Sequence, residues 1–338
     1  MEFIDEQLWP GIVGNWLLVL ALTSAAFGAF FYFKGTRSEE LLRERWYRLG
    51  RRFFWIHASA LIATVVLLFG LLLTRQFEYY YVWQHTNKAL QNKYIFASFW
   101  EGQEGSFLLW AFWHAILGMF LVHMARKHEG GLMFTLLLIQ AFLGTMVLGR
   151  VIYLPDLGID FTIGSNPFLL TREHPNFVGA PFTKLPDYLA GLDGRGLNPA
   201  LQNYWMTIHP PTLFLGFALT AVPFGFLMDG LLRRSFMDWM RPALPWAFVG
   251  VAVLGGGILM GGAWAYEALS FGGFWVWDPV ENASLVPWLL LTAGAHMLLI
   301  PKKTKLVLQL AFLFLIFAFV FVLYSTFLTR SGVLGDAS

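Results

Sequence analysis

Long apolar stretches recur along this 338-residue chain and constrain its fold more than any other feature. A stretch of about 17 to 25 apolar residues is long enough to cross the hydrocarbon core of a bilayer as a helix. Eight candidates are present, at residues 11–33, 53–74, 106–124, 131–149, 210–232, 243–265, 285–300 and 306–328. We therefore predict an all-α polytopic membrane protein with about eight transmembrane helices.

Composition supports this class and excludes others. Hydrophobic residues make up 57% of the chain and charged residues 13%, against about 45–50% and about 25% in soluble domains. Soluble modules, disordered tails and disulfide-rich secreted scaffolds are thereby excluded. The chain has no cysteine, so it can form no disulfide, thiolate metal site or catalytic thiol. The net charge of +2 gives no indication of a nucleic-acid partner.

Basic residues are distributed unevenly among the loops between the apolar stretches. Fifteen of the 23 Lys and Arg follow the first, third, fifth and seventh stretches, and the remaining eight lie elsewhere. Because basic loops stay on the cytoplasmic side, we predict that both termini and the even-numbered loops are external. The start of the chain is acidic, which does not suggest a cleaved signal peptide. Three predicted external segments are long or unusual, and function is expected in them: 75–105, 150–209 and 264–286.

The segment 264–286 is rich in tryptophan and contains no Lys or Arg. It holds three tryptophans, and a fourth follows closely: Trp264, Trp275, Trp277 and Trp288. A single tryptophan there is typical of the interfacial belt of a membrane protein. Gly272 and Gly273 let the backbone approach a partner closely, and Trp275 and Trp277 offer broad rigid faces. Together they favour a large planar apolar ligand.

The next residues predict the start of a helix. Asp278 would be the N-cap, Pro279 the first helical residue, and Glu281 would reach back as in a capping box. Pro287 interrupts the helix, so we expect a short helix on the external surface before the chain turns into the seventh span. A ligand role for Asp278 or Glu281 is compatible with this structural role, but the spacing does not require one.

Residues 271–288, FGGFWVWDPVENASLVPW, resemble the tryptophan-rich WWD signature of haem-handling membrane proteins. The continuation after the Trp-Asp pair resembles the CcmF-type family of cytochrome c biogenesis proteins. Further stretches agree in the same order: FWEGQEGS at 99–106, LNPALQN at 197–203 with IHPP at 208–211, and TRSGVL at 329–334. The resemblance covers nearly the whole chain. Phe271 and Phe274 stand where members of the family often have Trp.

The resemblance implies a subunit of a haem lyase complex in the bacterial cytoplasmic (inner) membrane, with the WWD segment on the periplasmic side. Haem would arrive on the chaperone CcmE, and a CcmH-type subunit would present reduced apocytochrome c. His209 is the implied ligand of the external haem, and His296 of a buried b-type haem (haem b) used for reduction. The other implied haem-contacting residues are Trp264, Gly272, Gly273, Trp275, Trp277, Asp278, Glu281 and Asn282.

From their positions in the sequence, the eight histidines are expected to have different environments. His209 precedes two prolines at the external mouth of the fifth span, where we expect an extended backbone. His114 and His296 lie about 12 Å and about 17 Å into their spans at 1.5 Å per residue. Such residues are functional candidates, and a hydrogen bond to a neighbouring helix is the alternative. His57 and His123 are expected at internal helix ends. His85, His128 and His174 are expected in solvated loops.

The second haem ligands of the family have no counterpart in this sequence. They would come soon after the TRSGVL motif and from a carboxy-terminal half. We therefore expect one membrane domain, 1–338, that is an amino-terminal fragment, with a split gene and a partner chain as the alternative. Two other functional classes stay open. A transporter or channel should carry charges near the midplane of several spans, and a respiratory haem or quinone subunit should pair histidines on facing helices.

Reporter fusions test the predicted orientation. Fusions after Arg45 and after Lys303 should both report a cytoplasmic location, because basic residues cluster at both positions. External signals at both would overturn the topology. An external signal after Lys303 alone would show that the short seventh stretch does not cross the membrane.

Overall fold

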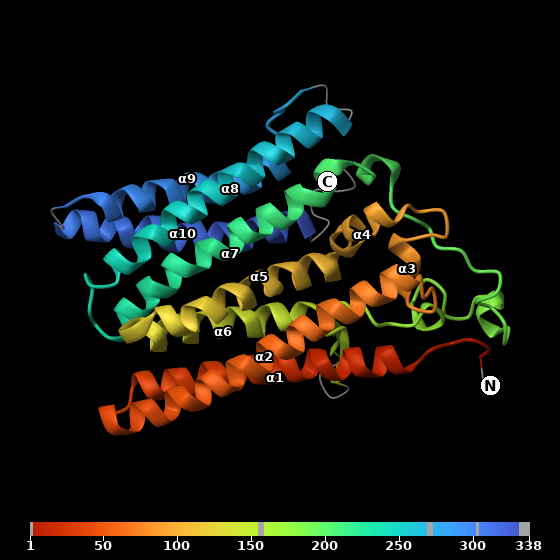
Figure 1. Ribbon diagram of the computed structural model, residues 1–338, viewed down its shortest axis with the longest axis horizontal. Coiled ribbons are helices and arrows are strands. Elements are labelled where there is room, and N and C mark those ends of the chain that lie inside the picture. Colours follow the sequence, from red (N-terminus) through yellow and green to blue (C-terminus); the bar gives the residue numbers. More distant parts are fainter. Residues whose placement is uncertain (1–2, 155–158, 269–272, 302–303, 331–338) are drawn as a thin grey trace. The chain divides into compact units, whose positions relative to one another are not determined.

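The computed structural model describes residues 3–154, 159–268, 273–301 and 304–330, and most of them are helical (Figure 1). Within these ranges, eight helices are long and apolar enough to cross a membrane. They are α1 (Trp9–Thr36), α2 (Glu40–Thr74), α5 (Gln103–Met124), α6 (Glu129–Met146), α7 (Tyr204–Leu232), α8 (Met240–Ala268), α9 (Pro279–Leu299) and α10 (Lys305–Arg330). The predicted all-α membrane fold is confirmed.

Several helices begin earlier than their apolar stretches do. α2 begins at Glu40 rather than at residue 53, and its 35 residues span about 52 Å. Its charged first turns therefore extend beyond a hydrocarbon core of about 30 Å. α9 begins at Pro279 and continues through Pro287 without a break. The separate surface helix predicted here is wrong, because an apolar helix tolerates the one backbone hydrogen bond that a proline removes.

Two of the segments between the long helices contain short helices, turns or strands among their described residues. Segment 75–105 holds α3 (Tyr80–His85), the 3-10 turn η1 (Asn92–Tyr94) and α4 (Ile95–Glu101). Segment 150–209 begins with an unpredicted antiparallel hairpin of β1 (Arg150–Leu154) and β2 (Ile159–Ile163), registered from Arg150↔Ile163 to Leu154↔Ile159. The remaining short elements are 3-10 turns: η2 (Arg126–His128), η4 (Thr171–Glu173), η5 (Pro181–Lys184) and η6 (Pro199–Leu201).

The chain forms two compact units, and the first comprises residues up to Thr23, Ile56–Phe112 and Ala141–Asn203. Buried polar contacts hold the residues just before α1 and at its start. The Tyr79 hydroxyl donates to the Gln7 carbonyl at 2.6 Å and accepts from the Gly11 amide at 2.8 Å. Burial raises the pKa of Tyr79 to about 12, so the hydroxyl stays a donor at neutral pH.

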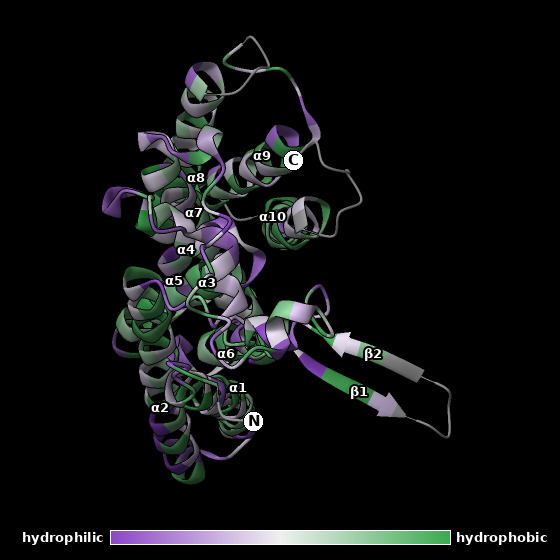
Figure 2. Ribbon diagram, turned by 90° about the vertical axis from the view of Figure 1, so that its right-hand side faces the viewer, coloured by the Kyte–Doolittle hydropathy of each residue, from purple (hydrophilic) through white to green (hydrophobic). Residues whose placement is uncertain are grey.

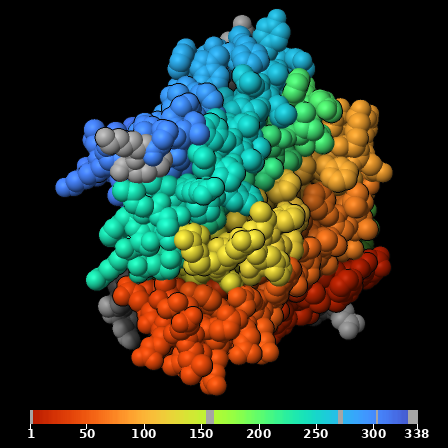
Figure 3. Space-filling model, turned by 60° about the vertical axis from the view of Figure 1, so that its left-hand side comes forward, coloured from red at the N-terminus to blue at the C-terminus, as the bar shows by residue number. Residues whose placement is uncertain are grey.

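The second unit comprises Ser24–Trp55, Trp113–Gln140 and the chain from Tyr204 onward. Within it α7 packs against α8, α8 against α9, and α10 against both α9 and α7 (Figure 1). In the space-filling view the side chains of α7 and α8, green to cyan, meet without an open gap (Figure 3). Glycine permits this approach, since a Cβ on Gly216 would lie 2.7 Å from the Leu254 Cα.

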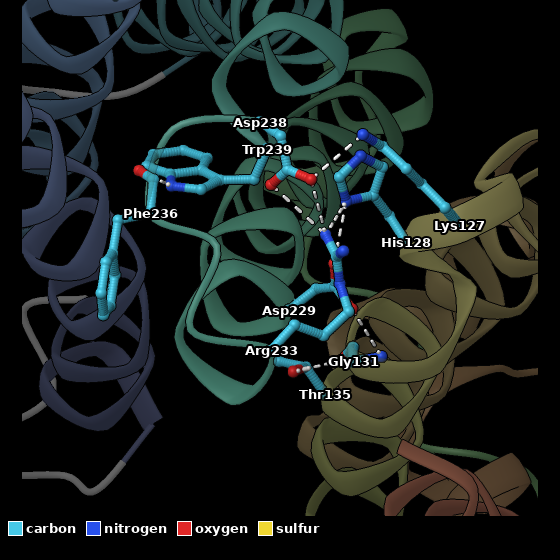
Figure 4. A network of polar contacts seen from close by, with 9 residues as sticks. All are labelled: Lys127, His128, Gly131, Thr135, Asp229, Arg233, Phe236, Asp238 and Trp239. Atoms are coloured by element: carbon cyan, nitrogen blue, oxygen red, sulfur yellow. Dashed lines mark hydrogen bonds and ion pairs between the residues drawn. The ribbon is translucent and has the colours of Figure 1, made fainter. Parts of the chain in front are cut away.

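A buried ion-pair network joins the turn before α6 to the end of α7 (Figure 4). Asp229, which has 0% exposure, accepts from Arg233 Nε at 2.7 Å and from the Gly131 amide at 3.1 Å. His128 Nδ1 lies 2.8 Å from the same carboxylate. His128 is therefore buried and paired, and the prediction that it is solvated is wrong.

Outward from Arg233, the network ends in a more exposed pair. Asp238 contacts Lys127 Nζ at 3.0 Å and Arg233 at 3.3 Å. Desolvation alone would raise the pKa of Asp238. Hydrogen bonds from Ser235 and Lys127 and the charge of Arg233 instead lower it to about 2.

We predict that Asp229→Ala lowers the free energy of unfolding by about 3–5 kcal/mol, because Arg233 and the Gly131 amide lose their buried acceptor. Lys127→Ala is the matched control. It breaks an ion pair whose lysine side chain is 63% exposed, so its cost should stay below about 1 kcal/mol. Denaturant unfolding in detergent micelles measures both variants. Equal losses would show that the buried carboxylate has no special role.

Candidate functional site

His209 lies in the second turn of α7 and is held by one face of α8. Its Nδ1 is 2.8 Å from the Gly257 carbonyl oxygen, and its ring stacks on Trp264 at 6.1 Å between centroids. A Cβ on Gly261 would come within 2.8 Å of the imidazole. The expected extended backbone before Pro210 is wrong, because α7 already begins at Tyr204 and contains both prolines.

The hydrogen bond to Gly257 determines the tautomer of His209. A carbonyl oxygen can only accept, so Nδ1 carries the proton and donates it. Nε2 then keeps its lone pair, and no hydrogen bond to it is found among the residues that the structure describes. Metal-binding histidines are commonly oriented in this way by a carbonyl on the other ring nitrogen. His209 is therefore prepared to act as a ligand through Nε2.

The aromatic turn, residues 273–278, connects to the start of α9. The Asp278 side chain accepts hydrogen bonds from the amides of Val280 at 2.6 Å and Glu281 at 2.8 Å. The Glu281 side chain in turn accepts a hydrogen bond from the Asp278 amide. The predicted N-cap and capping box are confirmed. The two carboxylates are thus occupied by backbone donors, which gives them a structural role in this turn.

Trp277 has a left-handed backbone, with φ of +61°, and its indole side chain is 68% exposed. A bulky residue in this region costs on the order of 1–3 kcal/mol. Hydrogen bonds on both sides maintain it: Glu281 accepts from the Val276 amide at 3.0 Å, and Asn282 donates to the Trp277 carbonyl at 2.9 Å. The turn therefore holds an exposed indole in a defined direction.

The aromatic turn and His209 attach to the same part of α8. A Cβ on Gly262 would lie 2.6 Å from the Phe274 ring, so this ring packs on the glycine. Trp275 meets Trp277 edge to face at 5.8 Å. The indole N–H groups of Trp264 and Trp275 are buried and have no acceptor among the described residues. The arrangement offers aromatic faces, two unused donors and one imidazole nitrogen.

His296 lies elsewhere, in the last turn of α9. Because α9 begins at Pro279, His296 is about 26 Å along the helix rather than about 17 Å. It is exposed on this chain, and its Nδ1 is 2.8 Å from the Thr292 carbonyl, which again leaves Nε2 as the lone-pair nitrogen. His114 is buried near the middle of α5, so the two histidines occupy different levels of their helices.

The remaining histidines have structural partners. His57 is buried near the middle of α2 and donates to the Ala21 carbonyl at 2.8 Å, so its expected place at an internal helix end is wrong, because α2 begins earlier than its apolar stretch. His85 pairs with Glu101, and His174 stacks on Tyr80, where burial lowers the pKa of His174. His123 is exposed and lies 6.2 Å from Trp55, centroid to centroid.

Sequence reasoning missed the residues of α8 that organise the site. Gly261 makes room for His209, Gly262 for Phe274, and Gly257 for the backbone of Leu213. The close spacing of these glycines in the sequence was the available signal of close helix packing. Trp205 donates to Glu267 at 2.7 Å and ties the start of α7 to the end of α8. Trp288 donates to the Val251 carbonyl within the helix pair and is structural. Gly272 lies outside the described residues.

Comparisons with known proteins show which family this chain is similar to. A family model described as "Cytochrome C assembly protein" matches residues 100–334. The chain is 34% identical over 323 residues to "Cytochrome c-type biogenesis protein CcmF" of Pseudomonas fluorescens, covering 95% of this chain and 45% of that protein. For CcmF of Escherichia coli K12 the identity is 32%, with 95% and 46% covered.

A solved structure shows the same fold. The protein titled "Cytochrome c Heme Lyase CcmF" superposes with a TM-score of 0.74 at 25% identity, covering 100% of this chain and 50% of that one. The chain therefore spans about half the length of the relatives that it matches.

We predict that Glu281→Ala loosens the aromatic turn, because the Val276 and Asp278 amides lose their acceptor. A lost cap costs about 1 kcal/mol, so amide exchange at these two residues should rise about fivefold. Glu281→Gln keeps an acceptor oxygen in the same place and should exchange nearly as the unmodified chain does. Hydrogen exchange read by mass spectrometry measures this. Equal exchange in both variants would contradict the role of Glu281.

Proposed function

This chain belongs to the cytochrome c assembly protein family, and from that membership we propose that it orients haem for covalent attachment to apocytochrome c within a haem lyase complex. Haem in the aromatic site would be the substrate, brought by a chaperone of the CcmE type. A CcmH-type subunit would present the apocytochrome. The names of the relatives describe cytochrome c biogenesis rather than transport or respiration, which disfavours those two alternatives.

The observation that carries this proposal is the state of His209. Its Nδ1–H donates to Gly257, so Nε2 is available to haem iron without a change of tautomer. Trp264 stacks beside the imidazole, and the Trp275–Trp277 pair provides further flat surface on the aromatic turn. The buried indole N–H groups of Trp264 and Trp275 have no acceptor among the described residues, and haem carboxylates would supply acceptors.

The role of this chain in the reaction is to bind and orient. Two thiols of the apocytochrome add across the two haem vinyl groups, each forming one C–S bond and placing its hydrogen on the neighbouring carbon. The chain has no cysteine, so both thiols come from the apocytochrome. Holding the porphyrin by one axial imidazole and by aromatic faces would present its vinyl edge in a fixed position, which lowers the entropic cost of the addition.

A resident haem b at His296 belongs to the same proposal. The imidazole fits this role, because the bond to Thr292 leaves Nε2 as the lone-pair nitrogen. Its exposure on this chain suits a second ligand supplied from outside these 338 residues, either by a carboxy-terminal half or by a partner chain. When bound, haem b would supply electrons that keep the substrate iron reduced.

The proposed location is the bacterial cytoplasmic membrane, with the aromatic turn on the periplasmic side. The charge distribution between loops and the eight apolar helices support this placement. The bilayer is accordingly a partner of the chain, and no nucleic-acid partner is proposed.

Substitutions made in the chromosomal copy of the gene test the proposal. His209→Ala should lower covalent haem on a reporter cytochrome c at least about tenfold, with similar protein levels. His174→Ala is the control, because His174 lies in the first unit and stacks on Tyr80 there, and this variant should mature cytochrome c normally. Haem staining after denaturing electrophoresis measures both. Normal maturation with His209→Ala would overturn the proposal.

The same variants separate the two haems. In protein purified together with the carboxy-terminal half or partner chain that supplies the second ligand, His296→Ala should remove the low-spin b-type absorption, whereas His209→Ala should leave that absorption in place. A b-type spectrum that survives His296→Ala would refute the assignment of His296.

A further inference from the structure

The residues that follow the β1–β2 hairpin contact the first turns of α1 and the end of α6. Asn166 donates to the Asn15 side chain at 2.6 Å, and the Ser165 amide donates to the Met146 carbonyl at 3.0 Å. The Phe168 ring covers Gly14, where a Cβ would come within 2.5 Å of it. These contacts place Arg150, the first residue of β1, beside α1.

The hairpin then leaves the helices sideways. Figure 2 shows β1 and β2 directed away from α1 and α6, across the direction in which those helices run. Transmembrane helices run close to the membrane normal, so in a bilayer the hairpin would lie close to the membrane plane. Val151, Tyr153 and Phe161 are exposed on it. A two-stranded hairpin with uncovered apolar side chains is marginal in water, and the interfacial region of a bilayer would cover it.

An open groove of about 280 Å³ lies at the base of the hairpin. It is lined by Ile12, Asn15, Trp16, Val19 and Arg150. From Ile12 to Val19 it follows about 10 Å of α1. Trp16 is 71% exposed. The groove therefore has a mainly apolar wall with a tryptophan at its edge and a single cation.

Arg150 is exposed, and its guanidinium has no hydrogen bond or ion pair within the part of the chain that the structure describes. None of the residues that line the groove is acidic. A guanidinium without a carboxylate partner, near the end of a membrane helix, is matched by a phosphate in fork geometry. The apolar residues below it match an acyl chain rather than a free anion.

We propose that this groove binds one anionic phospholipid. The lipid phosphate pairs with Arg150, the glycerol region lies near Asn15 and Trp16, and one acyl chain continues past Val19 along α1. The hairpin rests in the headgroup region beside it. An anionic headgroup is favoured over a zwitterionic one, because Arg150 is the only charged residue among those that line the groove. The residues of this groove belong to the first unit, and the proposal does not depend on haem.

Native mass spectrometry of the full chain, released from nanodiscs of mixed phosphatidylglycerol and phosphatidylcholine, tests the proposal. The unmodified chain should retain one phosphatidylglycerol. Arg150→Gln should lower that occupancy about tenfold, the loss expected for one charge-assisted hydrogen bond. Arg195→Gln is the matched control, since Arg195 is also exposed and lies in a loop outside the groove. It should retain the lipid.

A second variant keeps the charge and removes the space. Val19→Trp should fill the apolar part of the groove and lower lipid retention while Arg150 stays. Retention of phosphatidylglycerol by Arg150→Gln, or equal loss in Arg195→Gln, would overturn the proposal. Displacement of the lipid by inorganic phosphate would show a simple anion site and would also overturn it. Unchanged retention by Val19→Trp would exclude the groove as the place of binding.

Discussion

A carboxylate with no exposed surface, that of Asp229, is the constraint on which the second unit depends. A charge in this position is tolerated only when donors surround it, and the Gly131 amide and Arg233 provide them. Both partners are at ends of long helices, so satisfying one carboxylate also sets how the turn before α6 meets the end of α7. Glu129, on the same turn, is held by Arg51 at 2.6 Å and by the Tyr32 hydroxyl. The turn is therefore anchored to α1, α2 and α7 by two buried carboxylates.

The candidate site depends on backbone groups as much as on side chains. The Gly257 carbonyl determines which nitrogen of His209 keeps its lone pair. Glu281 and Asn282 hydrogen-bond the backbone on either side of Trp277 and maintain its left-handed conformation. A turn held in this way presents its aromatic surface without reorganisation. This lowers the entropic cost of orienting a large rigid ligand. Glu281 and Asn282 thus shape the surface of the aromatic turn through hydrogen bonds to its backbone.

The two proposed haem positions are at opposite ends of one helix. The aromatic turn leads directly into α9, and His296 lies in its last turn, about 26 Å from Pro279. The substrate would be handled at the membrane surface, and the resident haem would lie towards the other side. His296 is exposed on this chain, and the chain spans about half the length of the solved structure that it matches.

The sequence by itself determined the membrane class, the number of spans and the capping box, because these follow from apolar length and from hydrogen bonds between residues a few positions apart. It also indicated the family through motifs that are continuous in the chain. It could not show that His128 is buried, that α9 runs through Pro287, or that Arg150 lies beside Trp16. Only the tertiary structure decided the tautomer of His209, since Gly257 is 48 residues away in sequence. Burial, tautomer and pairing depend on contacts between distant segments, and a local pattern does not contain that information.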